Sequence, residues 1–332
     1  MTSAVDGDSM LGEGHVALVT GSTSGIGAET AHNLAATGAT IVVHGRDRAA
    51  GEDVVAELPG ADHAFYAADY TDFEDVRGLA DAVLADFDRL DCLVNNAGTW
   101  QGDRETVAVP GIDDGVELTF AVNHLATFLL TNRLADRLVA TGERRAEERR
   151  GAGGPDGDAE AGPARVVTVS SDLHRRAELD LDAVRGPDGP SGVGAYGHSK
   201  LANVLFTCDL ARRLPASVTA NCCHPGVSPS TGLSRNGSLV AGLGWKLLGA
   251  VGRLTGTVDT AAESAETQTY LASSPAVTGT SGEYFDDCEA VSPAAAATDR
   301  DARRDLWRAS VEWLGLDEGD VVGAGGEPAP EA

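Results

Sequence analysis

The sequence predicts an α/β protein with a Rossmann-type, doubly wound parallel sheet in a three-layer α/β/α arrangement, and two observations carry this prediction. From His15 onward, short runs rich in β-branched residues alternate with longer segments of helical periodicity, the order expected for a parallel sheet with helices on both faces. The strand runs are apolar throughout, as in Val166 to Val169, which suits a sheet covered on both sides.

About seven strands are expected, each ending in a turn or a helical segment. They span His15 to Thr20, Thr40 to His44, His63 to Ala68, Leu90 to Asn95, Arg165 to Ser170, Val218 to Cys223 and Glu283 to Phe285. Helices are expected between them, and the two longest run from Asp113 to Ala140 and from Tyr196 to Leu214. These two are candidate subunit contacts of a homo-oligomer.

The chain is expected to form a single domain over residues 15–316. Residues 1–14 are expected to form a flexible N-terminus. They contain no basic cluster or apolar stretch that would resemble a signal peptide, so export is not expected. Residues 142–163, a charged run followed by a Gly, Pro and Asp stretch, predict a helix end and a surface insertion. Residues 317–332 predict a disordered tail.

The charge balance is strongly acidic, with 51 acidic against 25 basic residues among 332 and a net charge of −26. Such a surface repels phosphate backbones, so nucleic-acid binding is disfavoured. Lys200 and Lys246 are the only lysines, and arginine supplies the other positive charges. The composition favours a protein from the salt-rich cytoplasm of a halophilic archaeon, because salt screens such self-repulsion. An acidic mesophilic protein from a GC-rich genome is the alternative.

The five cysteines are an odd number in a long chain and lack the paired spacing of a zinc site, so no metal is expected. Adjacent side chains on a strand point to opposite faces, which argues against Cys222 and Cys223 as a metal or redox pair. We interpret the cysteines as reduced thiols in a cytoplasm. No run of about 18 apolar residues occurs, so stable membrane insertion is not expected.

A glycine-rich turn, Gly21 to Gly27, lies between the first strand and a helical run, which is the order of a dinucleotide-binding loop. Gly21 permits a tight turn, Gly25 lets the backbone approach a pyrophosphate, and Gly27 lets the helix pack closely on the strand. An ordinary flexible turn is the alternative interpretation.

The end of the second strand reads His44, Gly45 and Arg46, without the acid that dehydrogenases preferring NAD usually present there. Because Arg46 can pair with a 2′-phosphate, NADP(H) is favoured over NAD(H), with Asp47 as the argument against. Asp69, just past the third strand, is placed to accept from an adenine amino group or to cap a helix.

Tyr196 and Lys200 share one face of a predicted helix, four residues apart. An ammonium beside a phenol favours the phenolate and so lowers the phenol pKa, which lets the tyrosine exchange protons near neutral pH. Ser170 and Ser171 end the fifth strand at the ligand-binding edge of the sheet, where a hydroxyl can hold a carbonyl. Asn123, within a predicted helix, can either bond backbone or position a water for proton relay.

In these motifs the sequence resembles the short-chain dehydrogenase/reductase family, over about residues 15–316. The motifs occur in the family's order: Thr20-Gly21-x-x-x-Gly25-Ile26-Gly27, Asn95-Asn96-Ala97-Gly98, Ser171, Tyr196-x-x-x-Lys200 and Pro225-Gly226. Within the family the chain is similar to the retinol dehydrogenase and WW-domain oxidoreductase branch. That similarity lies in Val122 to Leu125, Ser170 to His174, Tyr196 to Asn203, His224 to Val227, Tyr284-Phe285 and Leu306-Trp307.

The resemblance implies a catalytic set of Asn123, Ser171, Tyr196 and Lys200. Tyr196 would be the acid or base, Ser171 would orient the reacting oxygen, Lys200 would lower the tyrosine pKa and hold the nicotinamide ribose, and Asn123 would support a water. It also implies a set of cofactor contacts: Gly21, Ser22, Ser24, Gly25, Ile26, Gly27, Arg46, Asp69, Asn95, Ala97, Gly98, Tyr196, Lys200, Pro225, Gly226, Val227 and Ser230. The membrane anchor of many retinol enzymes is not found, which weakens a transfer of retinoid specificity.

The segment from Leu239 to Leu254 is apolar, with Lys246 and Arg253 its only charged residues. In the family this region covers the substrate, so a lipophilic carbonyl or alcohol is expected; a helix on a membrane surface is the alternative. The leading hypothesis is an NADP(H)-dependent oxidoreductase that interconverts an aldehyde or ketone and its alcohol. A nucleotide-sensing protein without turnover and a sugar-nucleotide epimerase are the other candidates.

Overall fold

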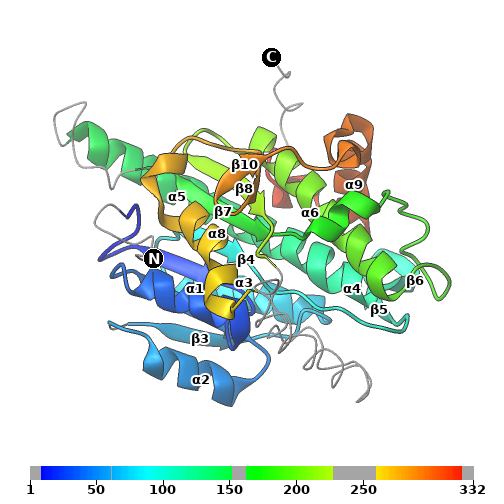
Figure 1. The fold of residues 1–332 in the computed structure, drawn as a ribbon, viewed down its shortest axis with the longest axis horizontal. Coiled ribbons are helices and arrows are strands. Elements are labelled where there is room, and N and C mark those ends of the chain that lie inside the picture. The colour runs from blue at the N-terminus through cyan, green and yellow to red at the C-terminus, as the bar shows by residue number, and fades with distance from the viewer. Residues whose placement is uncertain (1–8, 61, 152–161, 227–258, 324–332) are drawn as a thin grey trace.

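The computed structural model describes residues 9–60, 62–151, 162–226 and 259–323. In these residues eight strands form one sheet in the order β10-β9-β8-β7-β4-β1-β2-β3, from one end of the molecule to the other (Figure 1). The bounds are β1 Val16–Val19, β2 Thr40–Gly45, β3 Ala64–Ala67, β4 Cys92–Asn95, β7 Ala164–Val169, β8 Val218–Cys223, β9 Tyr284–Asp286 and β10 Glu289–Val291. All pairs are parallel except β9 with β10. The predicted Rossmann-type sheet is confirmed.

Helices cover both faces of this sheet, as the alternation of elements predicts. One apolar core lies under α1 (Gly25–Ala35), α2 (Arg48–Glu57) and α8 (Ala261–Ser273). The other lies under α3 (Phe73–Asp86), α5 (Ala126–Gly151), α6 (Gly192–Arg213) and α9 (Arg300–Trp313). Cys222 belongs to the second core and Cys223 to the first, so the two adjacent thiols point to opposite faces of β8.

A second, two-stranded sheet replaces the start of the helix predicted from Asp113 to Ala140. Here β5 (Thr106–Val109) pairs with β6 (Ile112–Glu117), and the helical part begins only with α4 (Leu118–Phe120). Gly115 has a φ of 72°, a conformation that favours glycine over a helical residue. The hairpin tip rests on α9, where the Gly111 amide donates to the Trp313 carbonyl at 2.7 Å. The hairpin therefore depends on a contact from a distant part of the chain.

The helix α9 packs against α5 and α6, the two helices considered as subunit contacts. The Trp307 ring lies 4.9 Å from the Phe128 ring and 5.9 Å from the Phe206 ring, measured between centroids. The guanidinium of Arg213 lies 4.0 Å from the centre of the same indole. Part of the surface of these helices is therefore covered within the chain itself.

Short turns complete the described fold. They are η1 (Ala121–Leu125, a π-helix), and the 3-10 turns η2 (Asp172–Arg176), η4 (Pro275–Val277), η5 (Ala295–Thr298) and η6 (Glu318–Asp320). The turn η6 falls in the predicted tail, and the Val322 amide nearby donates to Asn132 Oδ1 at 3.0 Å. Residues up to 323 therefore pack on α5 where the sequence predicts disorder.

The charged run predicted to start a surface insertion at residue 142 continues α5 as far as Gly151. Within it the Arg145 side chain is buried, and its guanidinium donates to Asp91 at 3.0 Å and to the Met10 carbonyl at 2.7 Å. Met10 and Leu11, in the predicted flexible N-terminus, are buried as well. The charged run therefore forms the end of a helix, and Arg145 within it is buried because Asp91 offers a partner. None of the helices in the described ranges combines the length and apolarity needed to cross a membrane.

Candidate functional site

The glycine turn after β1 lies at the carboxyl edge of the sheet and is tied to β2. The Gly21 amide donates to Nδ1 of His44 at 3.2 Å, and the Ser22 amide donates to the His44 carbonyl at 2.9 Å. Since Nδ1 of His44 accepts, its Nε2 carries the proton and donates to the Ala68 carbonyl at 3.3 Å. Burial lowers the pKa of His44 to about 4, so this ring stays neutral. Its two hydrogen bonds connect the ends of β1, β2 and β3.

Asn96, which the sequence analysis quoted only as part of a motif, locks the same turn from β4. Its Nδ2 donates to the carbonyls of Thr20 at 2.8 Å and Gly21 at 3.2 Å. The Thr20 hydroxyl accepts from the Asn96 and Ala97 amides, each at 3.0 Å. A Cβ on Gly21 would lie 2.8 Å from the Cα of Ala97, so the turn and the loop after β4 are in contact. Asn96 and Gly21 lie 75 residues apart along the chain, so no local sequence pattern indicates this contact.

The start of α1 offers an anion-binding end. Ser24 is its N-cap, is exposed and makes no side-chain capping hydrogen bond, and the first turn has no acidic residue. Gly25 has a φ of 61°, which turns the backbone into the helix. Ser22, by contrast, is buried, and its hydroxyl is used within the fold: it donates to the Val19 carbonyl at 2.6 Å and accepts from the His44 amide at 3.1 Å. The Ile26 and Gly27 residues are buried against the sheet.

Arg46 and Asp69 lie together at the ends of β2 and β3. The Arg46 guanidinium is 3.8 Å from the Asp69 carboxylate, and their side chains are 67% and 41% exposed. Asp69 Oδ1 also accepts from the Thr71 amide at 3.0 Å, while the cap of α3 is Asp72. Asp47, the residue that argued against a 2′-phosphate, accepts from the Ala50 amide as the cap of α2. Its carboxylate therefore has a structural partner on its own helix.

The loop after β4 meets Asn123 in η1. Asn123 Oδ1 accepts from the Thr99 amide at 2.7 Å, and its Nδ2 donates to the Thr99 carbonyl at 3.0 Å. A Cβ added to Gly98 would lie 3.2 Å from Asn123 Oδ1 and 3.6 Å from Lys200 Nζ, so this glycine keeps open a space between them. A π-helical turn within an α-helix often marks a functional position. Asn95 is buried, with its Nδ2 donating to the Thr131 hydroxyl at 2.9 Å.

Ser199, a residue not singled out in the sequence, connects Asn123 with the helix that carries Tyr196. The Ser199 hydroxyl accepts from Asn123 Nδ2 at 2.9 Å and donates to the Tyr196 carbonyl at 2.8 Å. Both side chains are buried. These buried hydrogen bonds thus fix the position of η1 relative to α6.

Ser171, Tyr196 and Lys200 come together at the ends of β7 and the start of α6. The Ser171 side chain lies near enough to Tyr196 to lower the pKa of its phenol, and Lys200 Nζ lies 5.5 Å from the centre of the Tyr196 ring. Lys200 is buried, and its Nζ donates to the Val169 carbonyl at 2.9 Å. Ser170 differs from its neighbour, because its buried hydroxyl donates to the Lys200 carbonyl at 2.8 Å. Of the two serines, only Ser171 faces the tyrosine.

The pKa of Tyr196 differs from the sequence prediction. Burial raises the Tyr196 pKa to about 12, although the nearby Ser171 side chain acts in the opposite direction. Burial also lowers the pKa of Lys200 to about 8. The predicted lowering by Lys200 is not found, since that ammonium turns to the Val169 carbonyl. The phenol is therefore protonated at neutral pH and is suited to donate a proton.

Pro225 and Gly226 follow β8 at the same edge of the sheet. Gly226 has a φ of 81°, and a Cβ there would meet the Asp259 carboxylate. Two expected nicotinamide contacts, Val227 and Ser230, lie outside the described residues, as does the apolar segment from Leu239 to Leu254.

A loop pinned by Arg104 joins the Ser171 turn to the Tyr196 helix. The Arg104 guanidinium donates to the carbonyls of Ala183, Arg185, Gly186 and Pro190. A cavity of about 140 Å³ opens between η2 and the start of α6. Its lining is Leu173, Arg176, Ala177, Glu178, Val193, Gly194, Gly197 and His198. Val193 is 56% exposed, the one large apolar side chain so exposed in the part of the chain that the structure describes.

The chain is similar in sequence to proteins of known family. The family model described as short chain dehydrogenase matches residues 15–147. Human retinol dehydrogenase 14 is 34% identical over 335 residues, covering 93% of this chain and 89% of the relative. Mouse retinol dehydrogenase 12 is 33% identical, covering 91% and 87%.

Solved structures show the same fold. A putative uncharacterized protein from Mycobacterium paratuberculosis superposes with a TM-score of 0.69 at 27% identity, covering 95% of this chain and 98% of its own. A putative short-chain dehydrogenase from Shigella flexneri, solved as a complex with NADP, has a TM-score of 0.58 at 21% identity and covers 84% and 99%. The chain therefore belongs to the short-chain dehydrogenase family, and it is an oxidoreductase that acts on CH–OH groups.

Proposed function

We propose that this protein is an NADPH-dependent reductase of lipophilic aldehydes or ketones, with Tyr196 as the proton donor. The observation that carries the proposal is the cluster at the end of β7, where Tyr196 lies close to Ser171 and beside the buried Lys200. NADPH, when bound, supplies the hydride. The side chains of the protein supply the proton and the orientation of the carbonyl.

Each side chain of the cluster has a distinct task in this proposal. Ser171 donates a hydrogen bond to the carbonyl oxygen and so draws it toward the tyrosine. Tyr196 transfers its phenolic proton to that oxygen as the C–O double bond becomes a single bond, which produces the alcohol. The Lys200 ammonium then stabilises the phenolate left on Tyr196. We assign to Asn123 and Lys200, which both lie close to Gly98, the return of a proton from solvent to the phenolate.

The residues at the other end of the site fit an anionic dinucleotide. At the α1 N-terminus the first backbone amides have no partner within the helix, and the Ser24 hydroxyl makes no capping hydrogen bond. Together with the positive end of the helix dipole, these groups favour binding of a pyrophosphate. Arg46 is two-thirds exposed and only loosely paired, so its guanidinium is free to turn to a 2′-phosphate. This supports NADP(H) over NAD(H).

A lipophilic substrate is supported by two features. The segment from Leu239 to Leu254 is apolar in sequence, and Val193 exposes its side chain beside the η2 turn that follows Ser171. Since cells keep NADPH largely reduced, reduction of the carbonyl is the direction we assign. An aldehyde series of increasing alkyl length should show kcat/KM rising with each added methylene, about fourfold for about 0.8 kcal/mol of burial.

The decisive test is NADPH oxidation with apolar aldehydes at high salt by wild type and Tyr196→Phe. We expect kcat/KM to fall by about 10²- to 10⁴-fold in the variant, the usual range for loss of a general acid. Tyr66→Phe is the matched control, because Tyr66 hydroxyl bonds Asp86 on the surface far along the sheet. Turnover that persists in Tyr196→Phe would refute the proposal, and a protein that binds NADPH but reduces no carbonyl would be a nucleotide-sensing protein.

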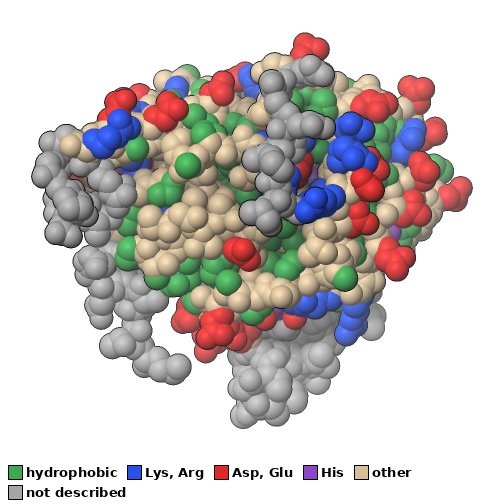
Figure 2. Space-filling model, turned by 90° about the horizontal axis from the view of Figure 1, so that it is seen from above, with side chains coloured by type: hydrophobic (Ala, Val, Ile, Leu, Met, Phe, Trp, Pro, Cys, Tyr) green, Lys and Arg blue, Asp and Glu red, His purple; other side chains and the backbone are tan. Residues whose placement is uncertain are grey.

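We also propose that the protein works in a salt-rich cytoplasm. The support is the excess of 26 negative charges and the burial of Lys200, the one lysine among the described residues. Figure 2 shows acidic side chains gathered along the rim of one face, with basic ones beside them. Arginine, which pairs with carboxylates through two nitrogens, supplies these surface cations.

A further inference from the structure

The turn that holds Ser171 contains a buried histidine that the proposed mechanism does not use. His174 has no exposed surface, and it follows Ser171 by three residues in η2. Its Nδ1 lies 2.7 Å from the Ser171 carbonyl, and its Nε2 accepts from the Ala294 amide at 3.0 Å. A backbone amide can only donate, so Nε2 has no proton and Nδ1 donates to the Ser171 carbonyl. The contacts therefore fix a single neutral tautomer.

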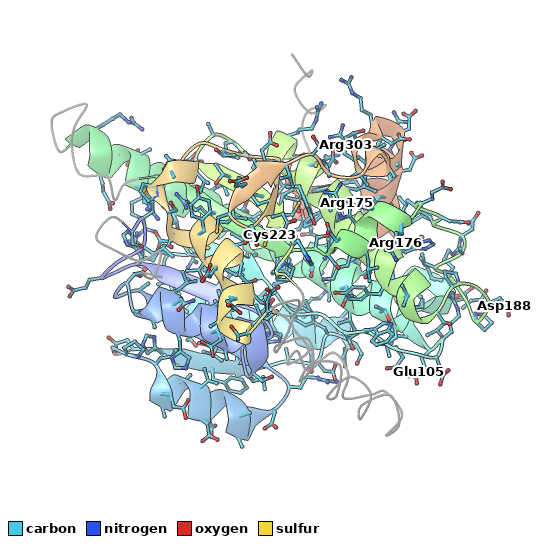
Figure 3. The ribbon with its side chains drawn as sticks, viewed as in Figure 1. Glu105, Arg175, Arg176, Asp188, Cys223 and Arg303 are labelled. Carbon is cyan, nitrogen blue, oxygen red and sulfur yellow. The ribbon has the colours of Figure 1, made fainter. Side chains whose placement is uncertain are left out.

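The partners of His174 belong to the far end of the chain. Its ring packs on Tyr284 of β9, with centroids 4.7 Å apart, and Ala294 follows β10. Arg175, labelled in Figure 3, strengthens the same junction by donating to Asp172 at 3.1 Å and to the Ser292 carbonyl at 3.0 Å. Two neighbouring residues thus fasten η2 to the segment after β10.

This junction determines the direction of the Ser171 side chain. The Ser171 backbone is extended, with φ −164° and ψ 152°, and its Oγ accepts from the Leu173 amide at 3.3 Å. Its carbonyl accepts from both the His174 amide, at 3.0 Å, and the His174 ring. The Leu173 amide thus uses a lone pair of Oγ, and the hydroxyl proton remains available to donate to a substrate oxygen. Removing the ring bond would let the carbonyl and the attached side chain rotate.

We propose that His174 is a positioning residue that orients Ser171, through its Nδ1–H bond to the Ser171 carbonyl, for carbonyl reduction. This rests on the proposed function, in which Ser171 holds the substrate oxygen. A purely structural histidine would affect stability alone, whereas a positioning residue affects kcat through Ser171. The two ring nitrogens have different partners, so two substitutions separate their roles.

His174→Asn places an amide nitrogen near Nδ1 and keeps the donor to Ser171. His174→Gln places its amide near Nε2 and keeps an acceptor for Ala294, but it loses the donor to Ser171. We expect kcat for an apolar aldehyde to fall less than about threefold in His174→Asn and about 10- to 100-fold in His174→Gln, since a displacement of about 1 Å costs that much. The NADPH Kd should stay within twofold in both. Equal losses of kcat in the two variants, in proportion to their Tm, would overturn the proposal.

A double-variant cycle tests whether the effect passes through Ser171. If it does, Ser171→Ala/His174→Gln should be no slower than Ser171→Ala alone. If the two losses multiply instead, His174 acts independently of Ser171 and the proposal fails. Should Ser171→Ala retain wild-type kcat, the role of Ser171 in the proposed function would be the part refuted, and with it the positioning role that depends on it.

A measurement without turnover keeps the two proposals distinguishable. Long-range ¹H–¹⁵N correlation spectra of the imidazoles, with His174→Gln used for assignment, report which nitrogen carries the proton. We expect His174 to remain the neutral Nδ1–H tautomer at pH 6.5, because burial lowers its pKa. An Nε2–H tautomer or an imidazolium at that pH would overturn the positioning role even if Tyr196-dependent reduction is observed.

Discussion

The Lys200 ammonium lies 5.5 Å from the centre of the Tyr196 ring and donates a hydrogen bond to the Val169 carbonyl at 2.9 Å. The lysine is therefore near enough to stabilise a phenolate by charge, but it makes no direct contact that would ionise the phenol in advance. Burial raises the Tyr196 pKa to about 12 and lowers the Lys200 pKa to about 8. The pair is arranged for proton donation.

The Lys200 pKa predicts a pH dependence of cofactor binding. Lys200 is charged below about pH 8 and neutral above it, so its attraction for the anionic cofactor is present at low pH and lost as the pH rises through 8. NADPH fluorescence titrations from pH 6.5 to 9.5 should show the Kd rising above pH 8. In Lys200→Arg the Kd should stay flat, because a guanidinium keeps its charge over this range. A flat wild-type profile would contradict the assigned role of the ammonium.

Much of the fold was predictable because the strands carry their own signal. The apolar runs in β1, β4, β7 and β8 are buried on both faces, and their predicted ends lie within two residues of the observed ones. The β5–β6 hairpin was missed because Gly111 and Trp313 meet only in the folded chain. Asp113 and Asp114 fit a helix start as well as an exposed strand.

In the candidate site too, some residues could be predicted from the sequence and others could not. Spacing on one helix brings Tyr196 and Lys200 together, and strand ends bring Ser171 to them, so these residues could be named from the sequence. Asn96, Ser199 and Arg104 act through hydrogen bonds to carbonyls and hydroxyls that are distant along the chain. Contacts of this kind leave no periodic pattern in the sequence, so the roles of these three residues could not be predicted from it.

Arg46 should decide between the two nicotinamide cofactors. Its guanidinium is 67% exposed at the end of β2, and removing it takes away a charge-assisted bond worth about 1.5–3 kcal/mol. We expect Arg46→Ala to raise the KM for NADPH about 10- to 100-fold and to leave that for NADH within twofold. Arg48→Ala is the control, because Arg48 pairs on the surface with Glu52. If both substitutions raise the KM for NADPH equally, the preference for NADPH would come from the general positive charge of this surface and not from a specific contact with Arg46.

The close approach at Gly27 should make the phosphate turn intolerant of any side chain. A Cβ there would collide with the Gly21 carbonyl and the Asn96 side-chain amide. Gly27→Ala should therefore lower the free energy of unfolding by about 1–3 kcal/mol and weaken NADPH binding at least tenfold. Urea denaturation and fluorescence titration measure the two effects.

Gly78→Ala provides the matched control for that substitution. Gly78 also lies in a helix, α3, but a Cβ there would have nothing within 4 Å. This variant should gain about 0.5–1 kcal/mol of stability and bind NADPH as wild type does. If Gly27→Ala behaved like Gly78→Ala, the turn and the Asn96 loop would not be in the contact described above.

The net charge of −26 predicts that salt stabilises the folded protein. Carboxylates crowd the surface of the compact state, and salt shortens the range of their repulsion from about 10 Å at 0.1 M to about 3 Å at 1 M. The Tm should therefore rise steeply between 0.1 and 2 M KCl. Asp53 and Glu57 are exposed carboxylates that form no ion pair with the residues the structure describes. Substituting arginine for both should raise the Tm at 0.1 M KCl and flatten the salt dependence. A Tm that falls with KCl, or one that responds only to sulfate through exclusion from apolar surface, would show that charge repulsion does not limit the stability of this protein.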